Sequence, residues 1–293
     1  MTLKEVWING KKFLKNEFET NKLDFSLIFQ EIFGLNRLEL VLYGDKQAEK
    51  FKIDSFFKML QRKKNGEPLQ YIIGHQEFYG LDLKIGNGVL IPRKDTETLV
   101  KVAVEMIDLQ HNSLAKLNIV DLCSGSGAIA LALKKEFKLA NVTAIEISPQ
   151  AFYFIKKNIA NTNINIKAIL GDIFKVYDDF KNSSLDLIIS NPPYISTNDL
   201  FFLEKEVKFE PKIALDGGHE GLDFYFNIIK KWSVKLKKGA IIAFEVGFDQ
   251  SNKVFKILKE SGFNNITIKK DLNGINRVVI AMHSQSRPGL TTV

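Results

Sequence analysis

The stretch with the clearest chemical content is Asn191-Pro192-Pro193-Tyr194, which follows the apolar run Leu187-Ile-Ile-Ser190. Two consecutive prolines remove two backbone donors and stiffen the turn, so backbone carbonyls stay free to accept hydrogen bonds. The Asn191 side-chain oxygen and the Pro192 carbonyl can then accept both N–H bonds of one planar NH₂ group, and Tyr194 can cover that group. The lone pair of such a nitrogen is delocalised, so the nitrogen is a poor nucleophile. Hydrogen bonds to both of its N–H groups orient the lone pair toward an electrophile. We therefore predict alkylation of an amide or amino nitrogen, with Asn191, Pro192 and Tyr194 catalytic and Pro193 beside them in the substrate site.

A second chemical pattern is the small-residue loop Asp121-Leu-Cys-Ser-Gly-Ser-Gly127, which follows an apolar run. Small residues let the backbone approach a nucleotide-like ligand closely. Glu146 stands nineteen residues after Gly127, where its carboxylate can accept hydrogen bonds from two ribose hydroxyls. By spacing, Gly125, Gly127 and Ala130 also satisfy the dinucleotide fingerprint, so a nicotinamide or flavin dehydrogenase stays open at this point.

Two further carboxylates help to choose between these ligands. We expect Asp121 at the mouth of the crevice, where a carboxylate suits a cationic ligand such as S-adenosylmethionine and is unfavourable beside a pyrophosphate. Asp172 ends a third apolar run and can accept from an adenine amino group, while Ile173 offers an apolar surface to the ring. These residues favour S-adenosyl-L-methionine as the cofactor, with S-adenosyl-L-homocysteine as the product.

The elements that must position these residues alternate between helix and strand from about residue 95. Strand patterns at 118–122, 142–146, 164–170, 185–190 and 240–246 are separated by helical patterns at 128–137, 149–161 and 222–236, with another helix at 250–260. Such alternation indicates βαβ units and a mostly parallel sheet with a ligand crevice at the carboxyl ends of its strands. A short turn joins 266–270 to 277–282, so these two strands must be antiparallel and we expect a reversed edge strand. The predicted fold class is α/β, a Rossmann-like sheet.

The first part of the chain has a different pattern. Residues 1–64 carry apolar side chains near the 3.6-residue spacing of amphipathic helices. Residues 77–85 alternate, Gly86-Asn87-Gly88 is typical of a turn, and 89–91 is again apolar, which predicts a β-hairpin. We therefore expect a helical, substrate-docking domain at 1–75, a β-hairpin connector at 76–94, a catalytic domain at 95–284 and a tail at 285–293.

Composition limits the classes of partner. The 293 residues carry a formal net charge of +7, but five of the 41 basic residues are Arg, the side chain most used to recognise phosphates and bases. The dense Lys run at 230–238 is expected on the solvated end of a helix that ends at Gly239, so nucleic acid is not required. One Cys and four His without ligand spacing predict no metal. We expect a cytoplasmic protein, because no apolar run is long enough to cross a membrane and no targeting pattern opens the chain. We also expect it to be a monomer.

Several motifs together carry a resemblance to a known family. Asn-Pro-Pro-Tyr after such a strand is the signature of amino-methyltransferases that act on adenine-N6, cytosine-N4 and protein glutamine. Additional segments occur in order over about residues 60–282: Gly66-Glu-Pro-Leu-Gln-Tyr-Ile-Ile-Gly74, Glu77-Phe-Tyr-Gly80, Ile91-Pro-Arg-Lys-Asp-Thr-Glu97, Phe209-Glu-Pro211, Ala214-Leu-Asp-Gly-Gly218, Gly221-Leu-Asp223 and Phe244-Glu-Val-Gly247. With these segments the sequence resembles the HemK/PrmC family of peptide chain release factor N5-glutamine methyltransferases.

The resemblance implies methyl transfer to the side-chain amide nitrogen (N5) of the glutamine in the Gly-Gly-Gln motif of class I peptide chain release factors. It implies that Asn191–Tyr194 form the glutamine site, and that the cofactor site is lined by Cys123, Ser124, Gly125, Ser126, Gly127, Glu146, Ile173 and Asn191. The chain departs from the family at Cys123, Lys94 and Ile173, where Gly, Pro and an aromatic residue are common. For the segment at 93–97 two interpretations stay open: helix capping by Asp95 with Arg93 paired to an acid, or support of the cofactor's methionine end by Arg93, Thr96 and Glu97.

Two other functions stay open on the sequence alone. An adenine-N6 DNA or RNA methyltransferase would use the same Asn-Pro-Pro-Tyr chemistry, although the short and nearly neutral helical start offers little for sequence-specific readout. A non-catalytic nucleotide-binding module would need the glycine loop but not Asn191.

Overall fold

The computed structural model describes residues 1–15, 18–19, 21–109 and 116–284; the predicted tail at 285–293 lies outside them. The chain forms two compact units. One comprises Met1–His75 with Glu204–Phe209, and the other comprises Gln76–Leu203 with Glu210–Val293. None of the described helices is long and apolar enough to cross a bilayer.

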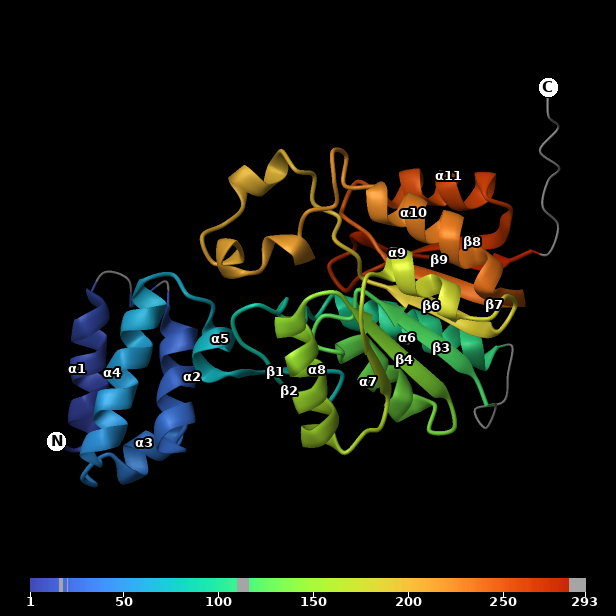
Figure 1. The fold of residues 1–293 in the computed structure, drawn as a ribbon. Coiled ribbons are helices and arrows are strands. Elements are labelled where there is room, and N and C mark those ends of the chain that lie inside the picture. Colours follow the sequence, from blue (N-terminus) through green and yellow to red (C-terminus); the bar gives the residue numbers. More distant parts are fainter. Residues whose placement is uncertain (16–17, 20, 110–115, 285–293) are drawn as a thin grey trace. The chain divides into compact units, whose positions relative to one another are not determined.

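The first unit is helical, as its apolar spacing predicts (Figure 1). Its helices are α1 (Leu3–Leu14), α2 (Lys22–Phe33), α3 (Arg37–Tyr43), α4 (Lys50–Lys64) and α5 (Leu69–Ile73). Phe25, Phe29 and Phe56 are fully buried between them, and the ring of Trp7 meets Phe25 edge-on with a centroid distance of 4.6 Å. Gly10 permits this packing, because a Cβ atom there would lie 2.7 Å from the Phe56 ring.

The second unit is built on a seven-stranded sheet with the order β5-β4-β3-β6-β7-β9-β8. The strands are β3 (Asn118–Leu122), β4 (Asn141–Glu146), β5 (Lys167–Leu170), β6 (Leu185–Ser190), β7 (Leu236–Glu245), β8 (Phe263–Lys270) and β9 (Asn276–His283). The first five in this order pair in parallel, and β9 is antiparallel to both β7 and β8. The α/β fold class is confirmed, with one correction: the reversed strand is β9, next to the edge, while β8 occupies the edge itself.

Helices cover both faces of this sheet (Figure 1). On one face lie α6 (Thr96–Asp108), α7 (Ala128–Glu136) and α8 (Pro149–Thr162); on the other lie α9 (Ile173–Val176), α10 (Asp223–Trp232) and α11 (Ser251–Glu260). Because successive strand residues point to opposite faces, Ile119 and Ile241 join the first core while their neighbours Val120 and Ile242 join the second.

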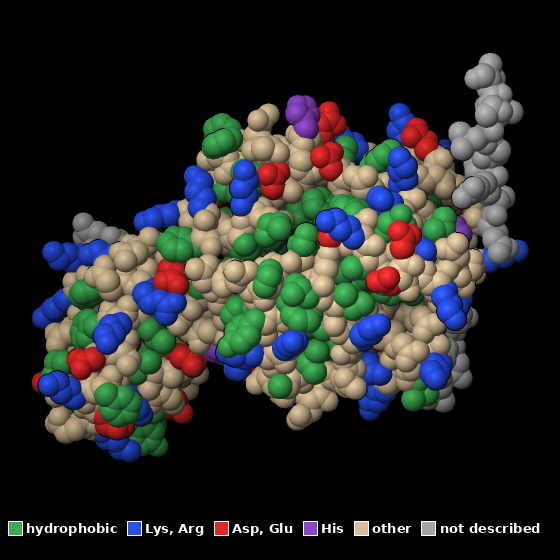
Figure 2. All heavy atoms as spheres, viewed as in Figure 1, with side chains coloured by type: hydrophobic (Ala, Val, Ile, Leu, Met, Phe, Trp, Pro, Cys, Tyr) green, Lys and Arg blue, Asp and Glu red, His purple; other side chains and the backbone are tan. Residues whose placement is uncertain are grey.

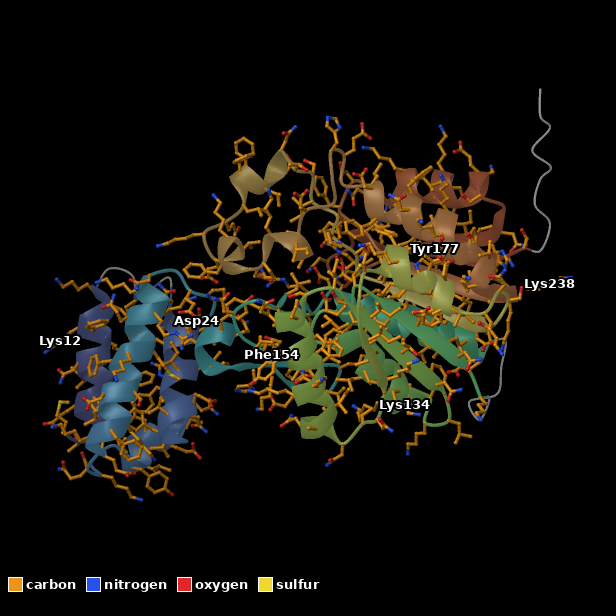
Figure 3. All side chains as sticks on the ribbon, in the orientation of Figure 1. Lys12, Asp24, Lys134, Phe154, Tyr177 and Lys238 are labelled. Atoms are coloured by element: carbon orange, nitrogen blue, oxygen red, sulfur yellow. The ribbon has the colours of Figure 1, made fainter. Side chains whose placement is uncertain are left out.

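The hairpin is present but not where the sequence predicts it. Its strands are β1 (His75–Phe78) and β2 (Leu81–Lys84), and residues 89–91 form no strand. The turn is Tyr79-Gly80, with φ of +52° and +68°, as a two-residue hairpin turn with both central residues left-handed requires. Gly86 instead allows a close approach to α8, because a Cβ there would lie 2.9 Å from the Phe154 ring. Phe154 is labelled on α8 in Figure 3.

The Lys run at 230–238 also departs from prediction. The helix α10 ends at Trp232, a single 3₁₀ turn covers Ser233–Lys235, and β7 begins at Leu236. Lys235 is buried, and its Nζ donates to the Phe180 carbonyl at 2.8 Å and to Asn182 Oδ1 at 2.9 Å. Lys237 pairs with Asp186 at 2.7 Å. The prediction of a solvated helix end is therefore wrong for these two residues. On the face seen in Figure 2, Lys and Arg side chains are spread among acidic and apolar ones.

Candidate active site

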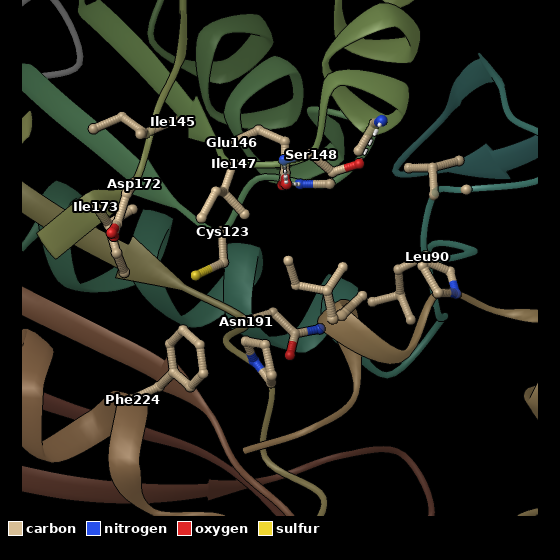
Figure 4. A pocket seen from close by; sticks show the side chains of 18 of the residues that line it. Leu90, Cys123, Ile145, Glu146, Ile147, Ser148, Asp172, Ile173, Asn191 and Phe224 are labelled. Carbon is tan, nitrogen blue, oxygen red and sulfur yellow. Dashed lines mark hydrogen bonds between the residues drawn. The ribbon is translucent and has the colours of Figure 1, made fainter. Parts of the chain in front are cut away.

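A cavity of about 250 Å³ lies at the carboxyl ends of β3, β4, β5 and β6 (Figure 4). This is the position at which open α/β sheets bind ligands. Seven of the predicted site residues line it: Cys123, Gly125, Glu146, Asp172, Ile173, Asn191 and Pro193. Six others do not: Asp121, Ser124, Ser126, Gly127, Pro192 and Tyr194. The cavity thus joins the two chemical patterns of the sequence in one place.

The glycine loop reaches the cavity through left-handed backbone. Cys123, Gly125 and Gly127 have φ of +60°, +56° and +81°, and the turn is closed by the Gly127 amide donating to the Ser124 carbonyl at 2.8 Å. Gly127 then precedes α7. Only Gly takes such angles without strain, so Cys123 is the costly member of the loop. Burial raises the pKa of the Cys123 thiol well above its ordinary value, which keeps the thiol neutral.

Glu146 is a carboxylate of the cavity wall whose two oxygens are both held by backbone amides. Its Oε2 accepts from the Gly125 amide and its Oε1 from the Ser148 amide, both at 2.8 Å (Figure 4). Burial raises the pKa of Glu146, and these backbone hydrogen bonds oppose the rise. Each oxygen keeps a further lone pair for a ligand hydroxyl, which is what a ribose needs.

Asp121 does not lie at the mouth of the crevice, contrary to the sequence prediction. It is fully buried within β3, one residue before the strand ends, and does not line the cavity. Neither carboxylate oxygen receives a hydrogen bond of normal geometry from the described residues. Burial raises its pKa from 3.8 to about 7. The Asp121 side chain therefore points into the protein interior and not into the cavity.

The far wall of the cavity combines one carboxylate with apolar side chains. Asp172 caps the start of α9, where its Oδ1 accepts from the Phe174 amide at 2.8 Å. Ile173 is buried, and its carbonyl accepts from the Trp232 indole N–H at 3.1 Å. Phe224 completes this wall (Figure 4). An acceptor next to a flat apolar surface suits an aromatic ring that carries an amino group.

The Asn191–Tyr194 segment follows β6 and is held by contacts on several sides. The Asn191 Nδ2 donates to Thr96 Oγ1 at 3.3 Å, and the Tyr194 hydroxyl donates to Glu245 Oε1 at 3.3 Å. The Tyr194 carbonyl accepts from Gln250 Nε2 at 2.8 Å. No described hydrogen bond uses the Pro192 carbonyl, so it remains free to accept.

A glycine-rich turn packs directly against this backbone. The Ile195 amide donates to the Leu215 carbonyl at 2.9 Å, and the Gly217 amide donates back to the Ile195 carbonyl at 2.8 Å. A Cβ atom at Gly217 would lie 2.7 Å from the Tyr194 Cα, and one at Gly221 would overlap the Tyr194 carbonyl. The glycines of this motif therefore serve close backbone approach.

The segment at 93–97 pairs with acids but is not capped as predicted. Arg93 forms a salt bridge with the buried Glu210, whose Oε2 accepts from the Ile91 amide at 3.1 Å. Asp95 precedes α6 but makes no side-chain cap; it lies 3.6 Å from Arg277. Of the two interpretations left open for this segment, the pairing of Arg93 with an acid is present, whereas capping by Asp95 is not.

Sequence reasoning missed much of the cavity wall. The additional lining residues include Val89, Leu90, Pro211, Ile213, Ala214 and Phe224. Pro211 and Ala214 stand in motifs already noted for their resemblance to a family, which could have marked them. Leu90 and Phe224 are ordinary apolar residues with no distinguishing signal in one sequence. Within the described ranges, no group of three or more His, Cys, Asp or Glu side chains could hold a metal ion.

The parallel sheet with one reversed strand beside its edge, together with a glycine-lined and acidic cavity at the strand ends, defines the class as an α/β methyltransferase. Residues 101–203 match the family described as methyltransferase small domain, and residues 5–74 match the PrmC N-terminal domain. The catalytic domain of hMettl16, solved in complex with an RNA hairpin, shares the fold with a TM-score of 0.55 at 14% identity, covering 82% of this chain and 84% of that one.

Curated relatives are much closer in sequence. A release factor glutamine methyltransferase from Fusobacterium nucleatum is 39% identical over 91% of this chain and 75% of its own length. One from Clostridium acetobutylicum is 36% identical over 96% of this chain and 99% of its own. The chain belongs to the release factor glutamine methyltransferase family, and it is an enzyme of that kind.

Proposed function

We propose that this enzyme transfers a methyl group from S-adenosyl-L-methionine to the N5 amide nitrogen of the glutamine in the Gly-Gly-Gln motif of class I peptide chain release factors. The observation that carries the proposal is the position of Asn191, which lies in the wall of the cavity that Glu146 and Asp172 also line. Asn191 thereby supports a connection between the proposed amide site and the proposed nucleotide site. Membership of the family supports the choice of a release factor as substrate.

The residues of the cavity fit the cofactor. Glu146 is pre-oriented by two backbone amides and would accept from the ribose hydroxyls. Asp172 would accept from the adenine amino group, with Ile173 and Phe224 against the ring. The backbone at Cys123–Gly127 would approach the methionine part. When bound, S-adenosylmethionine would supply an electrophilic methyl group on a sulfonium and leave as S-adenosylhomocysteine.

The chain's own contribution to the reaction is to orient a poor nucleophile. Asn191 Oδ1 and the Pro192 carbonyl accept the two N–H bonds of the glutamine amide, so that the nitrogen lone pair points toward the methyl carbon. These hydrogen bonds strengthen as the nitrogen becomes pyramidal and its N–H bonds more acidic, and the transition state is thereby stabilised over the ground state. We assign to Tyr194, held through its hydroxyl by Glu245, the covering of the amide against water. The proton is released to solvent after alkylation.

The proposal is tested with methyl-labelled S-adenosylmethionine and three separate acceptors: a purified release factor, the same factor with its Gly-Gly-Gln glutamine changed to Ala, and DNA. We expect label only in the unmodified release factor. Label in DNA and none in release factor would replace the proposal by the adenine-N6 alternative.

The role of Asn191 has its own test. Asn191→Ala removes the side-chain acceptor, so we expect transfer to fall by at least about a hundredfold. Cofactor affinity, measured by calorimetry, should weaken only modestly, because Glu146 and Asp172 remain. Full activity in this variant would refute the assigned role.

A further inference from the structure

The orientation of the Asn191 amide decides whether this residue can act as proposed. The two ends of an Asn side chain have nearly the same shape, but one donates and the other accepts. If the NH₂ end faced the cavity, it would repel the N–H bonds of a substrate amide. Something in the protein must therefore distinguish the two orientations.

Thr96 contacts the NH₂ end. It is buried, with 4% of its surface exposed, and stands at the first position of α6, where its amide donates to the Arg93 carbonyl at 3.1 Å. Its Oγ1 accepts from Asn191 Nδ2 at 3.3 Å. A threonine hydroxyl has a single proton, and that proton could equally be given to an Asn oxygen. The contact alone does not determine the orientation.

Glu245 can determine which way the Thr96 hydroxyl points its proton. It lies at the end of β7 with 2% of its surface exposed, and its Oε2 has no hydrogen-bond partner of normal geometry among the described residues. This oxygen can accept one more proton donor, and Thr96 is among the nearby groups that lower the pKa of Glu245. An ionised carboxylate only accepts, so a Thr96 proton turned toward Glu245 Oε2 would leave Thr96 Oγ1 able only to accept. The Tyr194 hydroxyl donates to the same carboxylate at 3.3 Å. In that arrangement the hydrogen bonds would run in one direction, from Asn191 to Thr96 and from Thr96 to Glu245.

Resting on the proposed function of Asn191, we propose that Thr96 is a positioning residue for methyl transfer: with its proton given to Glu245, it holds Asn191 Nδ2 and so turns Asn191 Oδ1 toward the substrate nitrogen. Thr96 does not line the cavity and acts only through Asn191. The Asn-Pro-Pro-Tyr turn, the start of α6 and the end of β7 thereby form one functional unit.

The test compares Thr96→Val, which keeps the shape but not the hydroxyl, with Thr96→Ser, which keeps the hydroxyl. We expect Thr96→Val to lower kcat about ten- to a hundredfold, since one orienting hydrogen bond is lost. The dissociation constant for S-adenosylmethionine should stay within about twofold, a change worth little free energy. Thr96→Ser should restore kcat to within about threefold of the unmodified enzyme.

Matched variants separate positioning from general damage. Thr98→Val changes the same residue type in the same helix, where no described hydrogen bond joins the side chain to Asn191, and should leave kcat unchanged. Glu245→Gln, which can donate to Thr96 and reverse the polarity, should lower kcat as Thr96→Val does. It also provides the test if Thr96→Val does not fold.

Unchanged kcat in Thr96→Val or in Glu245→Gln, with Asn191→Ala inactive, would overturn the positioning role and leave the proposed function standing. Failure of Thr96→Ser to restore activity would also count against it, because a hydroxyl in the right place would then be insufficient. Full activity of Asn191→Ala would instead refute the amide site on which both proposals rest.

Discussion

Asp121 and Glu245 are buried carboxyl groups, and each has a raised pKa. Burial raises both pKa values to about 7, from 3.8 and 4.5 respectively. A buried carboxylate without full hydrogen bonding disfavours its charged form. At neutral pH both groups are therefore close to their titration points, which makes pH a useful variable.

Asp121 makes the folded protein less stable as pH rises. Since its folded pKa lies above its unfolded value, the native state holds the proton between about pH 4 and 7 and the unfolded state does not, so the unfolding free energy falls through this window. Asp121→Asn removes that titration. Between pH 5 and pH 8 the unmodified protein should lose roughly 3 kcal/mol relative to the variant, measured by urea unfolding at both values. An equal pH dependence in the two proteins would contradict this.

Glu245 should give the enzyme an acid limb in its pH–rate profile. The ionised form is the one that accepts from Thr96, so kcat should be full above about pH 7 and fall as pH decreases through that value. The groups that face Glu245 are Thr96 and Asp95 from the start of α6, Tyr194 after β6, Tyr225 of α10 and Arg277 of β9. In Thr96→Val this limb should disappear, because Glu245 no longer acts on Asn191. If kcat of Thr96→Val still fell at the same pH, Glu245 would not act on Asn191 through Thr96.

At the scale of elements, the turn that contains Gly217 and Gly221 supports the Asn-Pro-Pro-Tyr backbone. Gly221 has a φ of +69° and faces the Tyr194 carbonyl, while Gly239 has a φ of +77° with no heavy atom near its Cβ position. A side chain added at either glycine would therefore be strained by the left-handed backbone, but only at Gly221 would it also overlap a neighbouring atom. This makes them a matched pair.

Gly221→Ala should lower both stability and kcat, whereas Gly239→Ala should lower stability alone. The left-handed backbone costs about 1 kcal/mol at each site, and the overlap with Tyr194 adds about 1–3 kcal/mol at Gly221. Thermal unfolding and kcat measured side by side would check this. Equal effects of the two substitutions on kcat would show that the turn does not support the active site.

Some strands of the sheet could be predicted from the sequence, whereas the hairpin and the long-range contacts could not. The strands 118–122 and 185–190 were predicted to the residue, because both are short apolar runs ended by unmistakable loops. The hairpin was misplaced because the left-handed conformation of Tyr79 gives no signal in the sequence. The chain does turn at 86–88, where the Val89 amide donates to the Gly86 carbonyl at 3.4 Å, but no strand follows, and both glycines lie close to α8. The direction of Asp121 and the pairing of Thr96 with Asn191, 95 residues apart, depend on tertiary packing. No local pattern contains them.

At the scale of the whole molecule, the chain forms two compact units, and the helical one includes Glu204–Phe209 from far along the sequence. Lys63 lies within that unit with its side chain only 3% exposed, 2.5 Å from Asp24 and 2.7 Å from Glu206. One buried cation thus neutralises two carboxylates, and it ties a short distant segment to the helices.

Removal of Lys63 should be costly for the helical unit. Lys63→Met keeps the length of the side chain but removes both ion pairs. Because Asp24 and Glu206 are 27% and 50% exposed and solvent screens their charges, we expect a loss of about 1 kcal/mol in unfolding free energy. Lys58→Met, on the same helix with an unburied side chain, is the control. Similar stability of the two variants would mean that the ion pairs contribute nothing net.

The central claim is that the cavity and Asn191 act together on a glutamine amide of a release factor. The most direct test is to treat a purified release factor with the enzyme and S-adenosylmethionine carrying an isotopically labelled methyl group, and to locate that methyl by tandem mass spectrometry. We predict a single labelled methyl on the side-chain nitrogen of the Gly-Gly-Gln glutamine, and none when Asn191→Ala replaces the enzyme. A Gly-Gly-Gln peptide without label, or a label on another residue, would contradict the claim.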